Sequence, residues 1–233
     1  MKTLGIIEAD ELHPDLKDDY RSYGHMFVQL FERLGFSFNY RFFHIQEGEF
    51  PSAFECDAYL ITGSKAGVYD NLAWIPNLQQ WISASFERQE KLLGICFGHQ
   101  ILAHTLGGHA DKSDKGWGVG LHNTQIDELP AWVKDTPKEL TLIYSHQDQV
   151  TQLPPQAQRL SSSDFCENAA FFIENRVLAF QGHPEFSVNF TQRLLARRQE
   201  VIGKEKLEQA LSTLNPPADA DIVGKWLGQF ITL

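Results

Sequence analysis

A cysteine between two glycines is the first group in this chain whose residue types and spacing could do chemistry. The segment Gly94-Ile95-Cys96-Phe97-Gly98 follows the apolar pair Leu92-Leu93 and precedes the helical pattern Ile101-Leu102-Ala103. A sharp turn from strand to helix would expose the Cys96 side chain, and the glycines would remove Cβ atoms that clash at such a turn. A helix N-terminus also favours the thiolate, which is the form that attacks carbon. We therefore expect Cys96 to be a nucleophile.

A candidate base for this thiol lies almost ninety positions further along the chain. The apolar run Val177-Leu178-Ala179-Phe180 is followed closely by Gly182-His183-Pro184-Glu185. If this segment is extended, His183 and Glu185 project from the same side of the backbone, and Pro184 favours that geometry in the residue before it. Glu185 would then orient the imidazole while His183 takes the thiol proton. The alternative for Glu185 is a solvated surface charge.

The other two cysteines give no sign of a disulfide framework or a metal site. Cys56 and Cys166 lie far apart in the chain, and we expect both to be small buried apolar residues. Three cysteines are an odd number at wide spacing, which fits a reducing compartment and leads us to expect a cytoplasmic protein. Neither a metal ion nor an organic cofactor is expected.

Composition and charge limit the class of partner. The 233 residues are 42% hydrophobic and 21% charged, with a formal net charge of −10. This acidic balance offers no basic footprint for nucleic acid or an anionic membrane, and no apolar run approaches the length of a membrane span. The chain meets Glu8 too early for a secretory signal. We expect a small-molecule substrate, with no nucleic-acid or membrane partner.

Short apolar segments alternate with helical patterns, which predicts a mostly parallel central sheet with helices on both faces. The expected strands lie near 3–8, 37–44, 58–62 and 91–95, and the expected helices at about 20–34, 75–89 and 98–106. Three further apolar segments predict a smaller antiparallel edge sheet, at 119–121, 140–144 and 170–173. The chain length suits a single α/β domain.

After the histidine and glutamate the sequence becomes helical. Helices are expected near 187–201 and 204–213, followed by a Pro216-Pro217 break and a final amphipathic helix through Trp226 to Ile231. We therefore predict one domain over residues 1–233 with a helical C-terminal extension at about 187–233. The basic cluster of Arg193, Arg197 and Arg198 has helical spacing and is expected to form a solvated face without a function.

Two motifs together resemble a known family. Gly94-Ile95-Cys96-Phe97-Gly98-His99-Gln100, followed by Gln181-Gly182-His183-Pro184-Glu185, is similar to the class I glutamine amidotransferases, over about residues 40 to 190. Within that family the chain most resembles the free-standing proteins related to the glutaminase part of GMP synthase. The resemblance implies a flavodoxin-like fold and a Cys-His-Glu triad. Cys96 would add to the side-chain amide carbon of glutamine, ammonia would leave after protonation by His183, and water would hydrolyse the glutamyl thioester.

This chemistry also requires an oxyanion hole, because two tetrahedral intermediates form. The backbone N–H of Phe97, next after the nucleophile, would supply one donor. The family pattern takes the second donor from a turn after an earlier strand, where this chain has Gly63 and Ser64. Many family members carry a second glycine and a proline after the first, whereas Ser64-Lys65 stands here. The alternative for Gly63 is a simple turn glycine.

Two further residues are expected in the substrate pocket. Gln100 resembles the family position that helps to bind the substrate glutamine, with a helix-surface amide as its alternative. The stretch Ser145-His146-Gln147-Asp148-Gln149-Val150 also matches the proteins related to GMP synthase. His146 is expected to shape the pocket, because no Cys or carboxylate stands at a spacing that would make a zinc site with it.

Three functions fit these residues. The first is a glutaminase or amidotransferase that releases ammonia to a separate synthetase, since the chain has no Walker-type phosphate loop and no room for a synthetase domain. The second is a γ-glutamyl peptidase or hydrolase acting on small γ-glutamyl peptides or conjugates. The third is a non-catalytic regulatory module on the same fold. Fold alone does not decide among them.

Overall fold

The computed structural model describes residues 1–134, 137–217 and 219–233. The strands are β1 (Thr3–Glu8), β2 (Asn39–His44), β3 (Ala58–Ile61), β4 (Lys91–Ile95), β5 (His109–Lys112), β6 (Gly118–Ile126), β7 (Glu139–His146), β8 (Asp148–Gln152), β9 (Gln158–Ser162), β10 (Ala170–Ile173) and β11 (Val177–Phe180). The helices are α1 (Pro14–Tyr20), α2 (Tyr23–Arg33), α3 (Trp74–Glu87), α4 (Phe97–Thr105), α5 (Val188–Arg197), α6 (Gln199–Ile202), α7 (Lys204–Ser212) and α8 (Ala220–Thr232), with a 3₁₀ turn at Ile45–Glu47.

One large mixed sheet forms the centre of the molecule, in the order β2-β1-β3-β4-β11-β10-β9-β6-β7, and β5 pairs with β8 in a separate two-stranded sheet. Strands β2, β1, β3, β4 and β11 run parallel. The remaining pairs, from β11 through β10, β9 and β6 to β7, are antiparallel. The prediction of a mostly parallel sheet was therefore wrong for half of it, although the three later apolar segments do form antiparallel strands.

The connections between strands explain this change of direction. Helices α1 and α2 lie between β1 and β2, and α3 lies between β3 and β4; helical crossovers of this kind join parallel strands. In contrast, only three residues separate β10 from β11, and a connection that short can join only antiparallel strands. The antiparallel strands thus extend the parallel sheet instead of forming an edge sheet of their own.

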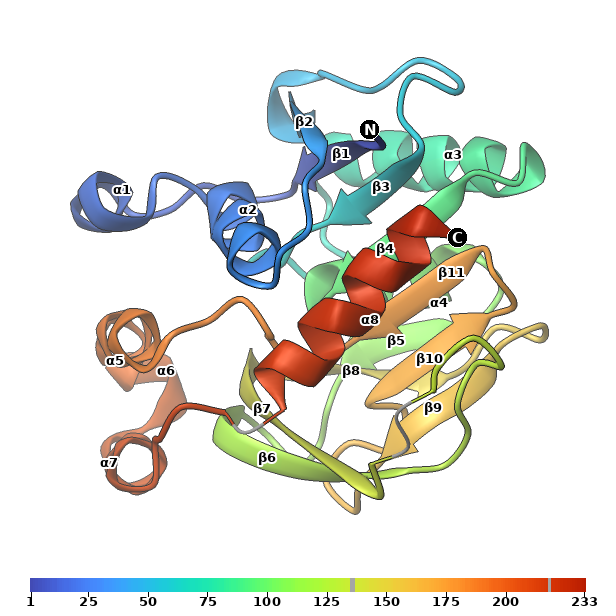
Figure 1. Cartoon of the computed structure of the whole chain (residues 1–233). Helices are drawn as coiled ribbons and strands as arrows, with labels where there is room; N and C mark the ends of the chain where they lie inside the picture. Colours follow the sequence, from blue (N-terminus) through green and yellow to red (C-terminus); the bar gives the residue numbers. More distant parts are fainter. Residues whose placement is uncertain (135–136, 218) are drawn as a thin grey trace.

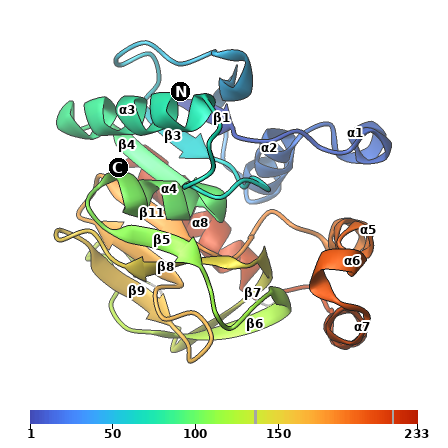
Figure 2. The same ribbon diagram turned by 180° about the vertical axis from the view of Figure 1, so that it is seen from behind.

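Helices cover both faces of the sheet, as predicted. Figure 1 shows α8 lying across one face, next to α2, and Figure 2 shows α4 and α3 on the other. Two apolar cores lie beneath these layers. The first includes Phe27 of α2 with Trp226 and Phe230 of α8, and the second includes Ile82 of α3 with Ile101 of α4.

The first helical pattern is divided in two. The helix expected at about 20–34 begins only at Tyr23, and a separate helix α1 precedes it. Between them Arg21 adopts a positive φ of 62°, and the Ser22 side chain accepts a hydrogen bond from the His25 N–H at 3.2 Å. Arg21 therefore ends the first helix, and the Ser22 side-chain cap starts the second.

Two glycines allow α4 to pack against the parallel strands. A Cβ on Gly98 would lie 2.2 Å from the Ile61 carbonyl oxygen, and a Cβ on Gly94 would lie 2.4 Å from the Gly98 carbonyl oxygen. No side chain fits either position without moving backbone. The sharp junction between β4 and α4 therefore depends on both glycines, as their spacing suggested.

Among the residues that the structure describes, no helix combines the length and the apolar character needed to cross a membrane.

We predict that Gly98→Ala lowers the free energy of unfolding by about 3 kcal/mol, because the added methyl overpacks against a backbone oxygen that cannot rotate away. Gly35→Ala is the control, since Gly35 has a φ of +84° but no heavy atom within 4 Å of the position that an added methyl would take. It should cost only the conformational penalty of about 1 kcal/mol. Urea unfolding measures both, and equal losses would contradict the packing explanation.

Candidate active site

Cys96 lies at the strained junction between β4 and α4. Its backbone has φ 55° and ψ −104°, a positive φ that non-glycine residues rarely adopt. The Cys96 N–H still donates to the Phe180 carbonyl oxygen at 2.9 Å, so the elbow is held to the neighbouring strand β11. The residue is only 5% exposed. The predicted strand-to-helix elbow is present in the structure.

His183 follows β11 and is held on three sides. Its N–H donates to the Ile143 carbonyl oxygen at 2.8 Å, and its Nδ1 lies 2.7 Å from Glu185 Oε1. The ring stacks on Phe186, with centroids 3.8 Å apart and planes 7° apart. The chain bends at Pro184 and Glu185 instead of continuing as an extended strand. The two side chains meet across this bend, so the expected pairing occurs with a different backbone geometry.

Cys96 and His183 come together beside Gly63. A Cβ built on Gly63 would lie 3.2 Å from His183 Cε1 and 3.6 Å from Cys96 Cβ. Gly63 follows β3, so three neighbouring parallel strands each deliver one of these residues at the same edge of the sheet. The glycine permits a close approach here and is more than a turn residue.

The charges around His183 favour its protonated form. Burial disfavours the imidazolium, but the Glu185 carboxylate and the Cys96 sulfur outweigh burial and raise the pKa of His183 to about 9. The Glu185 side chain is itself buried, and its Oε2 has no hydrogen-bond partner among the described residues. The carboxylate therefore acts on the imidazole in a site that solvent barely screens.

The two residues expected to supply oxyanion donors lie next to Cys96 in different ways: Phe97 follows it in the chain, and Ser64 lines the same cavities. Neither N–H donates to an acceptor within residues 1–134, 137–217 and 219–233. Phe97 begins α4, where the first N–H groups of a helix are free. The Ser64 side chain is engaged elsewhere, because its Oγ accepts from the Ala66 N–H at 3.2 Å.

A cavity of about 390 Å³ opens from Cys96 and is lined by Gln100 and His146. The Gln100 amide nitrogen donates to the Asp148 carbonyl oxygen at 2.8 Å and to Gln181 Oε1 at 3.1 Å. Gln100 is 3% exposed, so it is not a helix-surface amide. Burial lowers the pKa of His146 to about 3, and its Nδ1 lies 2.8 Å from the Asp148 carbonyl oxygen, to which the neutral ring donates.

Arg198 was expected on a solvated face, and the structure places it at the site instead. It lies at the end of α5, half-buried, and borders the cavity next to Cys96. Its Nη1 donates to Ser145 Oγ at 2.8 Å and to the Ser145 carbonyl oxygen at 3.2 Å. Arg193 and Arg197 do face solvent and pair with Asp15 and Asp19 of α1. The sequence held one sign that Arg198 could reach the site: the helix that it ends, α5, starts only three residues after Glu185.

The described part of the chain offers no ready metal centre. No group of three or more His, Cys, Asp or Glu side chains within it is arranged to hold a metal ion.

We predict that Glu185→Gln lowers the pKa of His183 below about 9, because the variant removes the strongest contribution that raises it. A raised pKa stabilises the fold fully below the unfolded value of about 6.5, and this stabilisation disappears as the pH rises through about 9. The difference in the free energy of unfolding between wild type and variant should therefore shrink between pH 7 and 10.

NMR titration of the imidazole measures the pKa of His183, and urea unfolding at several pH values measures the stability difference. Glu200→Gln, at an exposed position, is the control; an unchanged His183 midpoint in Glu185→Gln would refute the assignment.

Comparison with known proteins gives the family. The model of the glutamine amidotransferase class-I family matches residues 15–199. Gamma-glutamyl peptidase 2 of Arabidopsis thaliana is 30% identical over 222 residues, covering 92% of this chain and 89% of that protein. The glutamine-hydrolyzing GMP synthase subunit of Archaeoglobus fulgidus is 37% identical over 95 residues, covering 40% of this chain and 51% of that protein.

A solved structure agrees at the level of the fold. A glutamine amidotransferase from Thermotoga maritima superposes with a TM-score of 0.78 at 19% identity, over 99% of this chain and 96% of that one. The family match covers most of the chain, and its residue range includes both the strand-to-helix elbow and the histidine–glutamate pair. The chain belongs to the class I glutamine amidotransferase family.

Proposed function

We propose that this protein hydrolyses the side-chain amide of glutamine, with Cys96 as nucleophile, His183 as general acid and base, and Glu185 as the residue that orients the imidazole. The observation that carries the proposal is the 2.7 Å contact between His183 Nδ1 and Glu185, in a ring packed beside the Cys96 elbow. Glu185 on Nδ1 leaves Nε2 as the nitrogen that exchanges protons. A protonated imidazole stabilises the neighbouring thiolate.

In this mechanism the Cys96 thiolate attacks the amide carbon, and a carbon–sulfur bond forms as the carbonyl electrons move to oxygen. His183 gives its proton to the leaving nitrogen, the carbon–nitrogen bond breaks, and ammonia departs. Water then adds to the glutamyl thioester and gives a proton to His183. The carbon–sulfur bond breaks, glutamate leaves, and the thiolate is regenerated.

We assign the oxyanion hole to the N–H groups of Phe97 and of the Gly63-Ser64 turn. Such donors typically contribute about 3 to 4 kcal/mol each to the rate. The free N–H groups of Ser64 and Phe97 beside Cys96 support this assignment. Neither N–H is committed to another acceptor within the described residues, so both are available as donors.

We place the glutamyl part of the substrate in the large cavity, against Gln100 and His146. Both amide hydrogens of Gln100 are used by the protein, which leaves its Oε1 free to accept from the substrate ammonium group. His146 contributes to the wall and fixes the Asp148 carbonyl group. The similarity to the GMP synthase protein of Archaeoglobus fulgidus supports a separate synthetase as acceptor of the ammonia. The three free cysteines fit a reducing compartment such as the cytoplasm.

A second candidate reaction is hydrolysis of γ-glutamyl peptides by the same residues. The similarity to gamma-glutamyl peptidase 2, which extends over most of both chains, favours it. The two reactions share the acyl group and differ in the leaving group. Incubating the purified protein with glutamine and with γ-glutamyl dipeptides, and measuring ammonia and released amine separately, decides between them. Ammonia from glutamine supports the proposal; amine release without ammonia would overturn it in favour of the peptidase.

We predict that Cys96→Ala lowers ammonia release from glutamine by at least about a thousandfold, because loss of the nucleophile removes the covalent route. Cys166→Ala is the matched control. Burial raises the pKa of Cys166 to about 12, so it stays a thiol at neutral pH and should be dispensable for turnover. Wild-type hydrolysis by the Cys96→Ala protein would falsify the site assignment.

A further inference from the structure

Two cavities meet at Cys96, and His183 borders only one of them. The large cavity includes Gln100 and the cationic residues Lys65 and Lys112. The small cavity is lined by Cys96, His183, Arg198 and the side chains of Tyr23, Phe186 and Leu194, and also by Gly63, Ser64 and Ser145. The proposed function requires the leaving nitrogen to take its proton from His183. On that basis the small cavity is the leaving-group side of the site.

The small cavity is the size of its expected occupant. The centre of a water-sized molecule can occupy about 10 Å³ of it. A single water needs about 10–15 Å³ by the same measure, and ammonia is of similar size. The cavity is open on one side, so a substituent on the leaving nitrogen would have to pass through that opening, along the wall. The side chains at the opening therefore decide how large a leaving group can be.

Most of this wall is packed too firmly to move. Phe186 is 4% exposed and stacks on His183, while Tyr23 and Leu194 are 8% and 7% exposed in the same apolar cluster. Phe186 packs in turn against Phe190 of α5, with ring centroids 4.6 Å apart. These side chains cannot retreat without opening the core.

Arg198 differs from the packed residues Tyr23, Phe186 and Leu194. It is half-buried and borders both cavities, as Ser64, Cys96 and Ser145 also do, and its side chain is the longest of these four. No carboxylate lies within ion-pair distance of it over the described residues. Its guanidinium is held by Ser145 and lies over the Trp117 ring at 5.7 Å. Hydrogen bonds to one serine fix an arginine less strongly than a buried ion pair would.

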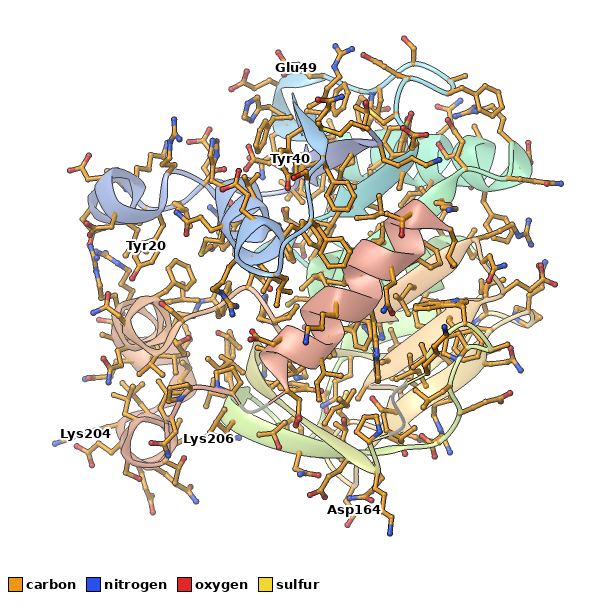
Figure 3. The ribbon with its side chains drawn as sticks, viewed as in Figure 1. Tyr20, Tyr40, Glu49, Asp164, Lys204 and Lys206 are labelled. Atoms are coloured by element: carbon orange, nitrogen blue, oxygen red, sulfur yellow. The ribbon has the colours of Figure 1, made fainter. Side chains whose placement is uncertain are left out.

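Contacts with α1 hold the helix α5 in place, and so they fix the backbone position of Arg198 at its end. Tyr20 Oη donates to Asn189 Oδ1 at 2.6 Å, and Arg193 Nη1 lies 2.5 Å from Asp19. Figure 3 shows Tyr20 between α1 and α5. With α5 tied to α1, the side chain at its C-terminal end is the movable part of the wall.

We propose that Arg198 is a specificity-determining residue that narrows the opening of the leaving-group cavity and so favours unsubstituted γ-glutamyl amides. The inference rests on the proposed function. By this inference, the volume of one side chain at the end of α5 determines whether the enzyme prefers glutamine or N-substituted substrates such as γ-glutamyl peptides. The charge of the guanidinium is not what excludes them, because a neutral N-alkyl amide meets the same wall.

The test compares kcat/KM for three substrates: L-glutamine, γ-L-glutamyl-ethylamide and γ-L-glutamylglycine. One extra methylene in a hydrophobic pocket changes kcat/KM roughly 10- to 200-fold, so wild type should prefer glutamine to the ethylamide by about a hundredfold. Arg198→Ala should raise kcat/KM for the ethylamide roughly tenfold or more relative to glutamine. Arg198→Met keeps most of the volume without the charge and should retain the wild-type preference.

Arg197→Ala is the matched control, since it removes an exposed arginine from the same helix, and its substrate preference should equal that of wild type. Ser145→Ala frees Arg198 without deleting it and should shift the preference part of the way. A wild-type enzyme that hydrolyses glutamine while the Arg198→Ala preference stays unchanged would overturn the inference alone. A γ-glutamylglycine rate that falls equally in Arg198→Ala and Arg198→Met would also overturn it, because charge recognition would then be the role. Absence of glutamine hydrolysis in wild type would instead count against the proposed function.

Discussion

The close packing of α4 on the strands β3 and β4 is the constraint on which the rest of the site depends. Gly98 lies against the Ile61 carbonyl oxygen and Gly94 lies against Gly98, so the chain must reverse within one residue. Cys96 occupies that residue and accepts a positive φ. Strain of this kind costs about 1–3 kcal/mol and persists only where the surroundings over-determine it. Here the helix and the sheet together fix the direction in which the thiol leaves the backbone.

The pairing of β4 with β11 brings the imidazole to this thiol. The two strands are parallel and in register, with Ile95 opposite Phe180 at their carboxyl ends. Residues that follow two neighbouring parallel strands leave the sheet at the same edge, which is where ligand sites of open α/β sheets lie. A separation of 87 positions in the chain, from Cys96 to His183, is therefore closed by one strand pair.

The sequence predicted the parts of the site that depend on local chemistry. The elbow around Cys96 follows from its flanking glycines, and the structure contains it. His183 and Glu185 do pair, but across a bend at Pro184 and Glu185 and not along the extended segment that their spacing suggested. The direction of the later strands was harder to predict. Periodicity identifies a strand but not its neighbour, and only the short turn after β10 carried information about direction. The mixed character of the sheet could therefore be predicted from the lengths of the connections but not from the apolar pattern.

Arg198 shows a second limit of sequence patterns. Arg193 and Arg197 are four positions apart, so they share one face of α5, and both pair with α1. Arg198 is the next residue, about a hundred degrees further around the helix, and it turns towards Ser145. A cluster of three arginines in sequence is thus two separate features in space. Counting the arginines does not separate these features, because the helical period decides which arginine side chain faces the site.

The orientation of the imidazole and the wall of the small cavity beside Cys96 depend on the same stack of aromatic rings. His183 stacks on Phe186, Phe186 packs against Phe190, and Phe190 meets Tyr20 of α1 with centroids 4.9 Å apart. The ion pairs between α1 and α5 are exposed, where each contributes only about 0–1 kcal/mol, so the rings supply most of the rigidity. Any displacement of α5 that widened the small cavity would also release the face of the imidazole. In the proposed reaction, proton transfer and leaving-group size are therefore coupled through packing, and a larger substrate would be better admitted by moving a side chain at the end of α5 than by moving the helix.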